Sequence, residues 1–325
     1  MRKTLTITSL MLLLAIFIVA CGNEDGNNQS NNSTSNNTID NKASTDDTRI
    51  YTDVAGNEVE IPVHPERVIT TQYLDALLAL DIKPVGASAH VLNNDYLGEL
   101  QEGVEDIGHP FDIEKVLALE PDLIIVSAEE DVEELSKIAP TVVIPWMYGD
   151  VYDQFREIAH IVGKEQKAED WIVALEEKAA EGREHLTITE EEIATIYMTH
   201  DKDVLRIYGG RNIGHIIYRL LELTPPDYIQ TKFDEDPEFN DFVYDDISME
   251  MLPEYAGDHI IMLTYDNETI AEGGMFHQVE QSALWQSLDA VQNDQLYLID
   301  AEPWFSYSPL AIEAALNEAI KLFSN

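Results

Sequence analysis

The stretch DIEKVLALEPDLIIV at residues 112–126 recurs 136 positions further on as MEMLPEYAGDHIIM at residues 249–262. In both copies an acid, Glu114 or Glu250, is followed two positions later by an aliphatic residue, eight later by Asp, and ten and eleven later by Ile-Ile. This spacing predicts a short helix, then a break at Pro or Gly, then a buried apolar strand. A helix-strand unit that occurs twice at this distance divides the chain into two equivalent halves.

The acids at the start of each copy have two explanations. Asp112 and Asp246 stand just before the predicted helices, where a carboxylate caps free backbone N–H groups. Glu114 and Glu250 fall in or near the first turns, where the helix dipole favours negative charge. The alternative is that two equivalent lobes each present one carboxylate to a partner with two-fold symmetry. The repeated stretch alone leaves both explanations open.

The first twenty residues have the features of an export signal. Arg2 and Lys3 precede an apolar run, which is too short and wrongly flanked for a stable membrane span. The run ends in IVAC at residues 18–21, which resembles the lipobox of bacterial lipoproteins, in which the cysteine is lipidated and becomes the mature N-terminus. Cys21 is also the only cysteine of the chain, so an intrachain disulfide is excluded and a lipid anchor is favoured.

Residues 21–48 are predicted to form a flexible tether, because Asn, Ser, Thr, Asp and Gly dominate them and apolar residues are too sparse to build a core. We therefore expect an extracytoplasmic protein that is lipid-anchored to the outer face of the cell membrane, as in Gram-positive bacteria.

The chain is strongly acidic. It has 62 acidic and 19 basic residues, and removal of residues 1–20, which hold two of the basic ones, leaves a net charge of 17 − 62, or −45. Nucleic acid is excluded as a partner, since no basic stripe is present to release counterions. Charge repulsion of this size destabilises a compact state and is screened by salt, which favours the hypothesis of a saline or alkaline habitat.

The salt hypothesis makes a simple prediction for stability. We expect the melting temperature to rise between low salt and about 1 M NaCl, because the added ions screen repulsion among the acids. Calorimetry at the two salt concentrations measures this, and an unchanged melting temperature would contradict the hypothesis.

The folded part, residues 49–325, has the pattern of a two-lobed α/β protein. Strands and helices alternate up to residue 144, residues 151–186 are helical in pattern apart from Gly163, and the alternation then resumes. We predict two doubly wound, mainly parallel lobes, residues 49–165 and 187–325, joined by one long rigid helix at 166–186, with the ligand cleft between the lobes. Besides the two copies, the predicted strands are 67–71, 84–88, 141–144, 193–198, 204–208 and 296–299, and the predicted helices are 73–80, 132–138, 212–223 and 309–323.

Four segments carry a family resemblance: DVAGNEVEIP at 53–62, PERV at 65–68, LEPDLI at 119–124 and IAPTV at 138–142. In this order after a lipobox, they make residues 49–325 resemble the periplasmic-type binding proteins of ABC importers for ferric siderophores, haem and cobalamin. The resemblance implies a monomer whose ligand sits between two lobes joined by a helix. It also implies that a glutamate on each lobe docks onto arginines of the permease, and by position these glutamates are Glu114 and Glu250.

The loops after the predicted strands are where a ligand is expected, because open α/β sheets bind ligands beyond the carboxyl ends of their strands. In the first lobe these loops supply Gln72, Tyr73, His90, His109 and Tyr148, the last directly after Trp146 and Met147. For the two histidines, a solvated loop position is the alternative explanation.

In the second lobe, basic residues gather in VLRIYGGRNIGH at 204–215. A strand that ends in Gly-Gly lets the backbone approach a ligand, and an arginine donates up to five hydrogen bonds to oxygen-rich groups. The resembled family has a similar turn whose arginine contacts siderophore oxygens, which points to Arg211, with Asn212 sharing the role if the register shifts by one residue. Arg206 and Tyr208 on the preceding strand are further candidates, with an outward-facing ion pair as the alternative for Arg206.

The loop EPWFSYSP at 302–309 follows the last strand and concentrates three aromatic residues. The resemblance implies an aromatic wall of the cleft here, and we predict that Trp304 and Tyr307 form it, with core packing as the alternative.

Charge favours one class of ligand. Ferric tris-catecholates carry about three negative charges and need several cations, whereas ferric hydroxamates are neutral or cationic and suit an aromatic wall with one or two arginines. We therefore predict a ferric hydroxamate siderophore, with no cofactor and no metal site of the protein itself, since iron enters only with the ligand.

Two other functions have partial support in the sequence. A haem- or metal-binding importer protein could use Tyr148, His109, His215 or His277, but their spacing is not that of metal ligands. An extracellular hydrolase could use acids such as Glu129, Glu130 or Asp266, but no Gly-x-Ser-x-Gly elbow, cysteine nucleophile or zinc motif is present. We therefore predict that the protein is not an enzyme.

Overall fold

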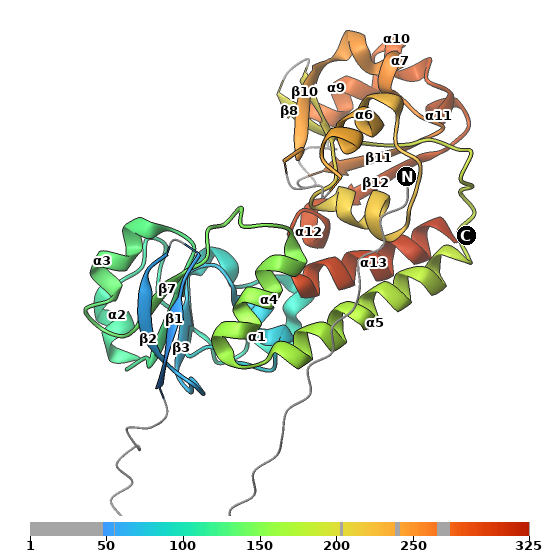
Figure 1. Ribbon diagram of the computed structural model, residues 1–325. Coiled ribbons are helices and arrows are strands. Elements are labelled where there is room, and N and C mark those ends of the chain that lie inside the picture. Colours follow the sequence, from blue (N-terminus) through green and yellow to red (C-terminus); the bar gives the residue numbers. More distant parts are fainter. Residues whose placement is uncertain (1–47, 55, 202–203, 238–240, 265–273, 325) are drawn as a thin grey trace, which may run out of the picture. The chain divides into compact units, whose positions relative to one another are not determined.

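The structure is a computed structural model that describes residues 48–54, 56–201, 204–237, 241–264 and 274–324 (Figure 1). The predicted export signal, Cys21 and nearly all of the predicted tether lie outside the described residues. In the described part of the chain, no helix is both long and apolar enough to cross a membrane.

The N-terminal lobe is built on a five-stranded parallel sheet with the order β5-β4-β3-β6-β7. Its strands are β3 (Val68–Thr70), β4 (Gly86–Ala87), β5 (Glu105–Asp106), β6 (Leu123–Val126) and β7 (Thr141–Val143). Helices α1 (Leu74–Ala79), α2 (Ile113–Ala118) and α3 (Val132–Leu135) lie between the strands in sequence, with short 3-10 turns at Ala89–Val91, Asp95–Gln101 and Glu129–Asp131. An antiparallel hairpin of β1 (Thr48–Thr52) and β2 (Glu58–Pro62), which was not predicted, precedes the lobe.

The first copy of the repeat has the structure predicted for it. The carboxylate of Asp112 accepts the backbone N–H groups of Glu114 at 2.9 Å and Lys115 at 3.4 Å, so it caps α2. All four side chains of β6 are buried. Glu114 remains exposed in the first turn of the helix.

Two helices follow the first lobe. Helix α4 (Val151–Val162) ends at Gly163, whose φ of +66° lies in the left-handed region that favours glycine. Helix α5 (Glu165–Arg183) then runs for 19 residues, so the predicted linker at 166–186 is confirmed as a long helix that starts one residue earlier and ends three earlier.

The C-terminal lobe has a five-stranded sheet with the order β10-β9-β8-β11-β12. Its strands are β8 (Ala194–Asp201), β9 (Val204–Tyr208), β10 (Tyr244–Ser248), β11 (His259–Thr264) and β12 (Leu296–Asp300). The helices are α6 (Asp227–Glu235), α7 (Leu252–Tyr255), α9 (Met275–Glu280), α10 (Ala283–Gln286), α11 (Asp289–Gln292), α12 (Ala301–Trp304) and α13 (Pro309–Phe323), with a π-helical segment at His215–Leu220 and a 3-10 turn at Met249–Met251.

Three predictions for this lobe were wrong in part. The sheet is mixed, because β9 is antiparallel to both β8 and β10. The helix predicted at 212–223 is the shorter π-helical segment. Asp246 is no helix cap, since it lies within β10 directly opposite Arg206 on β9.

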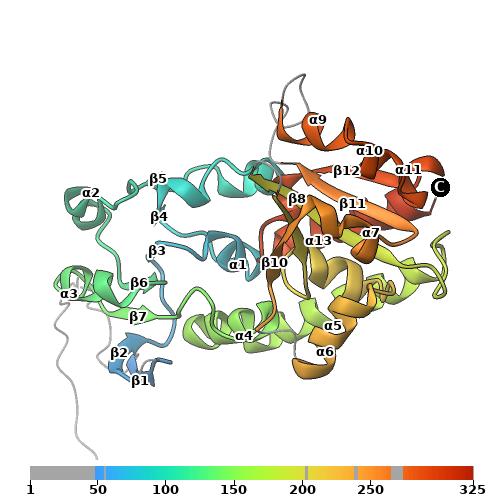
Figure 2. The same ribbon diagram turned by 90° about the horizontal axis from the view of Figure 1, so that it is seen from above.

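One apolar core runs through both lobes. It includes Val142 and Phe155 on the N-terminal side, Leu175 of α5, and Ile261 and Leu316 on the C-terminal side. Helix α13 packs against both α5 and α1, and Figure 2 shows α1 and α4 between the two sheets. The lobes are therefore held together by shared packing as well as by the linking helix.

Candidate functional site

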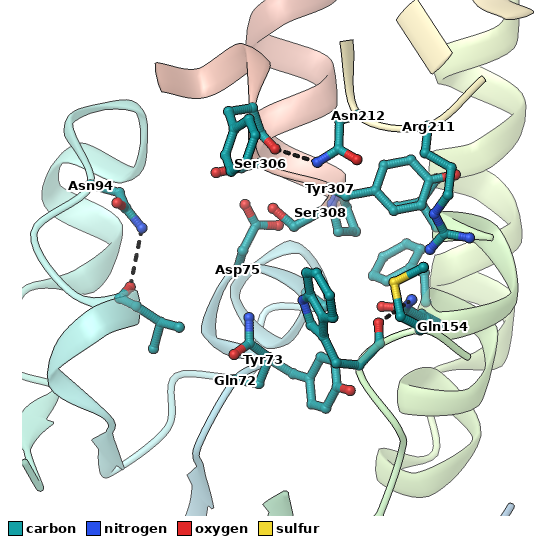
Figure 3. Close-up of a pocket in the computed structure, with 18 of the residues that line it drawn as sticks. Gln72, Tyr73, Asp75, Asn94, Gln154, Arg211, Asn212, Ser306, Tyr307 and Ser308 are labelled. Carbon is teal, nitrogen blue, oxygen red and sulfur yellow. Dashed lines mark hydrogen bonds between the residues drawn. The ribbon is translucent and has the colours of Figure 1, made fainter. Parts of the chain in front are cut away.

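A pocket of about 540 Å³ lies where the carboxyl-end loops of the two sheets meet (Figure 3). Loops after β3, β4 and β7 line it from the N-terminal lobe, and the loops after β9 and β12 line it from the C-terminal lobe, together with α1, α4 and the start of β10. This is the position at which open α/β sheets bind ligands.

Six of the ten predicted ligand residues line this pocket: Gln72, Tyr73, His90, Tyr208, Arg211 and Tyr307. The ring Nε2 of His90 donates to Oε1 of Gln72 at 2.9 Å, and the hydroxyl of Tyr73 donates to the carbonyl of Ile144 at 2.5 Å. These bonds tie the loops after β3, β4 and β7 to one another. The pocket wall on this side is therefore preformed.

The other four predicted residues lie elsewhere. Trp304 is 1% exposed and its indole N–H donates to Glu318 at 2.8 Å, so it belongs to the core and not to the pocket wall. Arg206 pairs with Asp246 at 2.9 Å. His109 packs against His90 with 4.2 Å between ring centroids and 46° between the ring planes, but it does not itself line the pocket, and Tyr148 does not line it either.

Several residues that line the pocket were not predicted. Trp146 and Met147 lie in a loop where a ligand was expected but were not named as ligand residues. They are 63% and 47% exposed, which is unusual for apolar side chains and cannot be read from the sequence. Several other lining residues that were not among the ten predicted ligand residues carry an amide, a hydroxyl or an aromatic ring, and they include Asn94, Tyr96, Gln154, Phe155, Asn212, Tyr244, Phe305, Ser306 and Ser308. Asn212 is the residue expected to share the role of Arg211 if the register shifts by one residue, and its side-chain N–H donates to the carbonyl of Phe305.

Arg211 is held at the junction of the lobes. Its side chain is 2% exposed, Nη1 donates to the carbonyl of Gly149 at 2.7 Å, and the guanidinium lies 4.5 Å from the centroid of the Tyr307 ring. Figure 3 shows Arg211 and Tyr307 side by side on one flank of the pocket. The arginine thus faces the pocket while one of its five donors contacts the other lobe.

Two glycines near Arg211, one before it and one after it, are required by close approach of the chain to itself and not by a ligand. A Cβ on Gly209 would stand 2.4 Å from the carbonyl oxygen of Phe242, and one on Gly214 would stand 1.6 Å from the carbonyl oxygen of Gly209. Neither glycine lines the pocket. Glycine is required at both positions because the chain approaches itself, and the expected approach of the backbone to a ligand was wrong for Gly209.

Asp75 joins α1 of one lobe to α13 of the other. Its Oδ1 accepts the backbone N–H of Leu310 at 2.9 Å and its Oδ2 that of Ala311 at 3.2 Å, while Ser308 at the helix start makes no such bond. Burial raises the pKa of Asp75 to about 6, although the two N–H donors act in the opposite direction. A carboxylate from the first lobe therefore caps a helix of the second.

We expect Asp75→Ala to lower the free energy of unfolding by about 1–2 kcal/mol at pH 7, because the first turn of α13 loses its cap. Urea unfolding measures the change. Asp95→Ala, which removes an exposed acid, is the matched control. Equal stability of the Asp75 variant and wild type would show that the cap contributes nothing.

His215 contacts Tyr307 of the pocket lining and is fully buried. Its Nδ1 is 3.4 Å from the hydroxyl of Tyr307, and its ring packs edge-on against Tyr152. Burial, with the charges of Arg219 and Arg211, lowers the pKa of His215 to about 3, while Asp150 acts in the opposite direction. The imidazole is therefore neutral at any pH near neutrality.

The low pKa of His215 predicts a loss of stability in mild acid. Below about pH 6.5 the imidazole of His215 binds a proton in the unfolded chain but not in the folded protein. The free energy of unfolding therefore decreases as the pH drops from there toward 3. Between pH 7 and 5 the loss from this group is about 2 kcal/mol.

Urea unfolding of His215→Gln at the two pH values tests this, since the variant should lose about 2 kcal/mol less than wild type. The exposed histidine His64, replaced by Gln, serves as the control. Identical pH dependence of the His215 variant and wild type would contradict the prediction.

The described residues contain no group of three or more His, Cys, Asp or Glu side chains that could hold a metal ion. None of the four candidates for haem ligation, Tyr148, His109, His215 and His277, lines the pocket. The acids named for a hydrolase are also outside it, with Asp266 outside the described residues.

Comparison with known proteins decides the family. Residues 68–303 match the periplasmic binding protein family, which is most of the chain. The chain belongs to this family. The expected resemblance and the two-lobed α/β fold are thereby confirmed, and a binding role is the role typical of the family.

Two relatives of this periplasmic binding protein come from Bacillus subtilis. The iron(3+)-hydroxamate-binding protein FhuD is 34% identical over 314 residues, 94% of this chain and 93% of that protein. The iron(3+)-hydroxamate-binding protein YxeB is 30% identical over 318 residues, 96% of this chain and 94% of that protein.

A solved structure from the same organism is similar in fold. It is the FhuD-fold periplasmic binding protein component of a ferrichrome ABC transporter, with a TM-score of 0.73 and 31% identity over 85% of this chain and 100% of that one.

Proposed function

We propose that this protein is the solute-binding component of an ABC importer, which captures a ferric hydroxamate siderophore in the pocket and delivers it to the permease. Iron enters only as part of the ligand, and the protein contributes no cofactor and no chemical step. Two relatives that match more than nine-tenths of this chain are named as iron(3+)-hydroxamate-binding proteins, which supports the ligand class.

The observation that carries the proposal is the balance of charge in the pocket. The described lining of the pocket contains two carboxylates, those of Asp75 and Glu302, and one guanidinium, that of Arg211. The nearby arginines Arg206 and Arg219 pair with Asp246 at 2.9 Å and with Asp150 at 2.8 Å. A site with this balance suits a neutral or cationic ferric complex and opposes one with three negative charges.

The remaining lining suits the body of such a complex. Trp146, Met147 and Phe305 offer apolar surface, while the amides of Gln72 and Asn94 offer N–H donors for hydroxamate oxygens. A pocket of this kind binds through fit and a few placed polar groups and needs little net charge.

Delivery and anchoring complete the proposal. Glu114 and Glu250 are both exposed and stand at equivalent places in the two copies of the repeat, so they are proposed to dock on two arginine sites of the permease. Cys21 is proposed to carry the lipid that holds the protein at the outer face of the cell membrane. The shared core and the linking helix favour a small closure on binding, with the permease opening the pocket.

Tryptophan fluorescence tests the ligand class. Trp146 lies in the pocket, so a ferric trihydroxamate is expected to quench emission in a saturable way with a Kd of about 1 μM or below. Ferric enterobactin, a tricatecholate, should bind at least about tenfold more weakly, and haem should show no shifted Soret band. Trp146→Phe is the control that assigns the signal, and a preference for the tricatecholate or for haem would overturn the proposal.

A further inference from the structure

We propose that Glu302 makes the pocket selective for ferric trihydroxamates that carry a protonated amine over otherwise identical neutral ones. This inference rests on the proposed function and adds a charge preference to it. It concerns one carboxylate at the pocket wall and needs no further site.

Glu302 is placed to meet a ligand. It follows β12, its side chain is exposed, and it belongs to the pocket lining. The hydroxyl of Ser306 lies 3.3 Å and 3.4 Å from its two carboxylate oxygens, and a hydroxyl has one proton to donate. Since a carboxylate has about four acceptor positions, an exposed one takes donors from a ligand as well.

The other charged groups of the pocket are more buried than Glu302. Asp75 is 6% exposed and uses both oxygens on the N-terminus of α13, and Arg211 is 2% exposed and bonds to Gly149. Burial and the nearby His109 lower the pKa of His90, so this ring is neutral at pH 7. Glu302 is therefore the most exposed charged side chain in the described lining.

Asp75 strengthens the negative potential at the same wall. The hydroxyl of Tyr96 is close enough to both acids to be affected by their charges: burial first of all, and then the charges of Asp75 and Glu302, raise its pKa. Figure 3 shows Asp75, Ser306 and Ser308 on one part of the pocket and Arg211 on another. A cationic group near Glu302 would thus be attracted by two carboxylates and lie away from the guanidinium.

The chemistry of the ligand supplies such a group. Three hydroxamates neutralise the charge of ferric iron, so the complex is neutral unless a free amine adds one positive charge. An ammonium group donates three hydrogen bonds and pairs with an exposed carboxylate, whereas acetylation removes both the charge and the salt bridge. For a pair exposed to solvent, the expected gain is about threefold to fivefold in affinity.

The experiment compares ferrioxamine B, which has a free amine, with its N-acetyl derivative, which has the same iron-binding groups. Fluorescence titration at pH 7 and low salt should show wild type binding ferrioxamine B about threefold to fivefold more tightly. Glu302→Gln should bind both complexes equally. Glu177→Gln removes an equal charge from the exposed face of α5, and it should keep the preference, which separates a local effect from that of the acidic protein as a whole.

Salt gives a second measurement that needs no variant. About 1 M NaCl should bring the two wild-type affinities together, because it screens an exposed pair. Equal affinities of wild type at low salt, a preference that survives in Glu302→Gln, or a preference unchanged by salt would each overturn the inference. If both complexes bind wild type tightly and equally, only the selectivity fails, whereas failure of both to bind contradicts the proposed function itself.

Discussion

Replacement of Arg211 by Ala is expected to weaken binding of a ferric trihydroxamate by about tenfold to a hundredfold, the range for loss of a charge-assisted hydrogen bond in a desolvated site. Among the described lining residues Arg211 supplies the guanidinium, and its 2% exposure means that water screens it little. Contacts with Gly149 and Tyr307 hold the side chain in place, so its donors are oriented before the ligand arrives.

Two variants separate the role of Arg211 in binding from a role in folding. Arg206→Ala removes an arginine that pairs with Asp246 outside the pocket lining, and its affinity should stay within about twofold of wild type. Arg211→Lys keeps the charge and loses the planar fork, so it should recover only part of the affinity. Calorimetric titration measures all three, and unchanged affinity of Arg211→Ala with a normal unfolding curve would contradict the role.

Simultaneous replacement of Glu114 and Glu250 by Ala, or by Arg, is expected to abolish siderophore-dependent iron uptake and leave ligand affinity unchanged. Both side chains are exposed, neither lines the pocket, and each belongs to one copy of the repeat, so the pair can contact a permease with two equivalent subunits or halves. Removal of an exposed acid changes stability by about 0.5 kcal/mol or less, so the fold should survive.

Uptake of radioactive iron measures the effect, in cells that lack the wild-type protein and express the variant. Glu99→Ala with Glu177→Ala removes two exposed acids elsewhere and should transport at the normal rate. A double Glu114/Glu250 variant that still transports would contradict permease docking. One that loses ligand affinity would show that these acids act within the protein.

The sequence predicted the strongly patterned elements well. The first copy of the repeat, β6, α5 and α13 follow from long apolar periodicity or from a capping acid, and α13 was predicted with its observed bounds. The second copy was less accurate because Asp246 was assigned by analogy with Asp112. In the structure Asp246 is paired across antiparallel strands with Arg206, and such a pairing between distant segments leaves no periodic signal in either one.

The sequence predicted several site residues that closely follow a strand. Gln72, Tyr73, His90 and Arg211 were found because they follow strands whose carboxyl ends meet at the pocket. Trp304 and Tyr307 lie three positions apart on an irregular segment, where no period tells which side chain faces inward, and the structure buries Trp304 against Glu318. The exposure of Trp146 and the helix cap by Asp75 depend on how the two lobes pack against each other. The sequence around Trp146 or around Asp75 does not specify this packing.

The most direct test offers the protein a choice of ligands. We would incubate it with equal amounts of ferrioxamine B, ferric enterobactin and haem, and identify the retained complex by native mass spectrometry. The proposed function predicts one ferric trihydroxamate bound per protein chain. Retention of the tricatecholate or of haem in its place, or retention of no ligand, would contradict it.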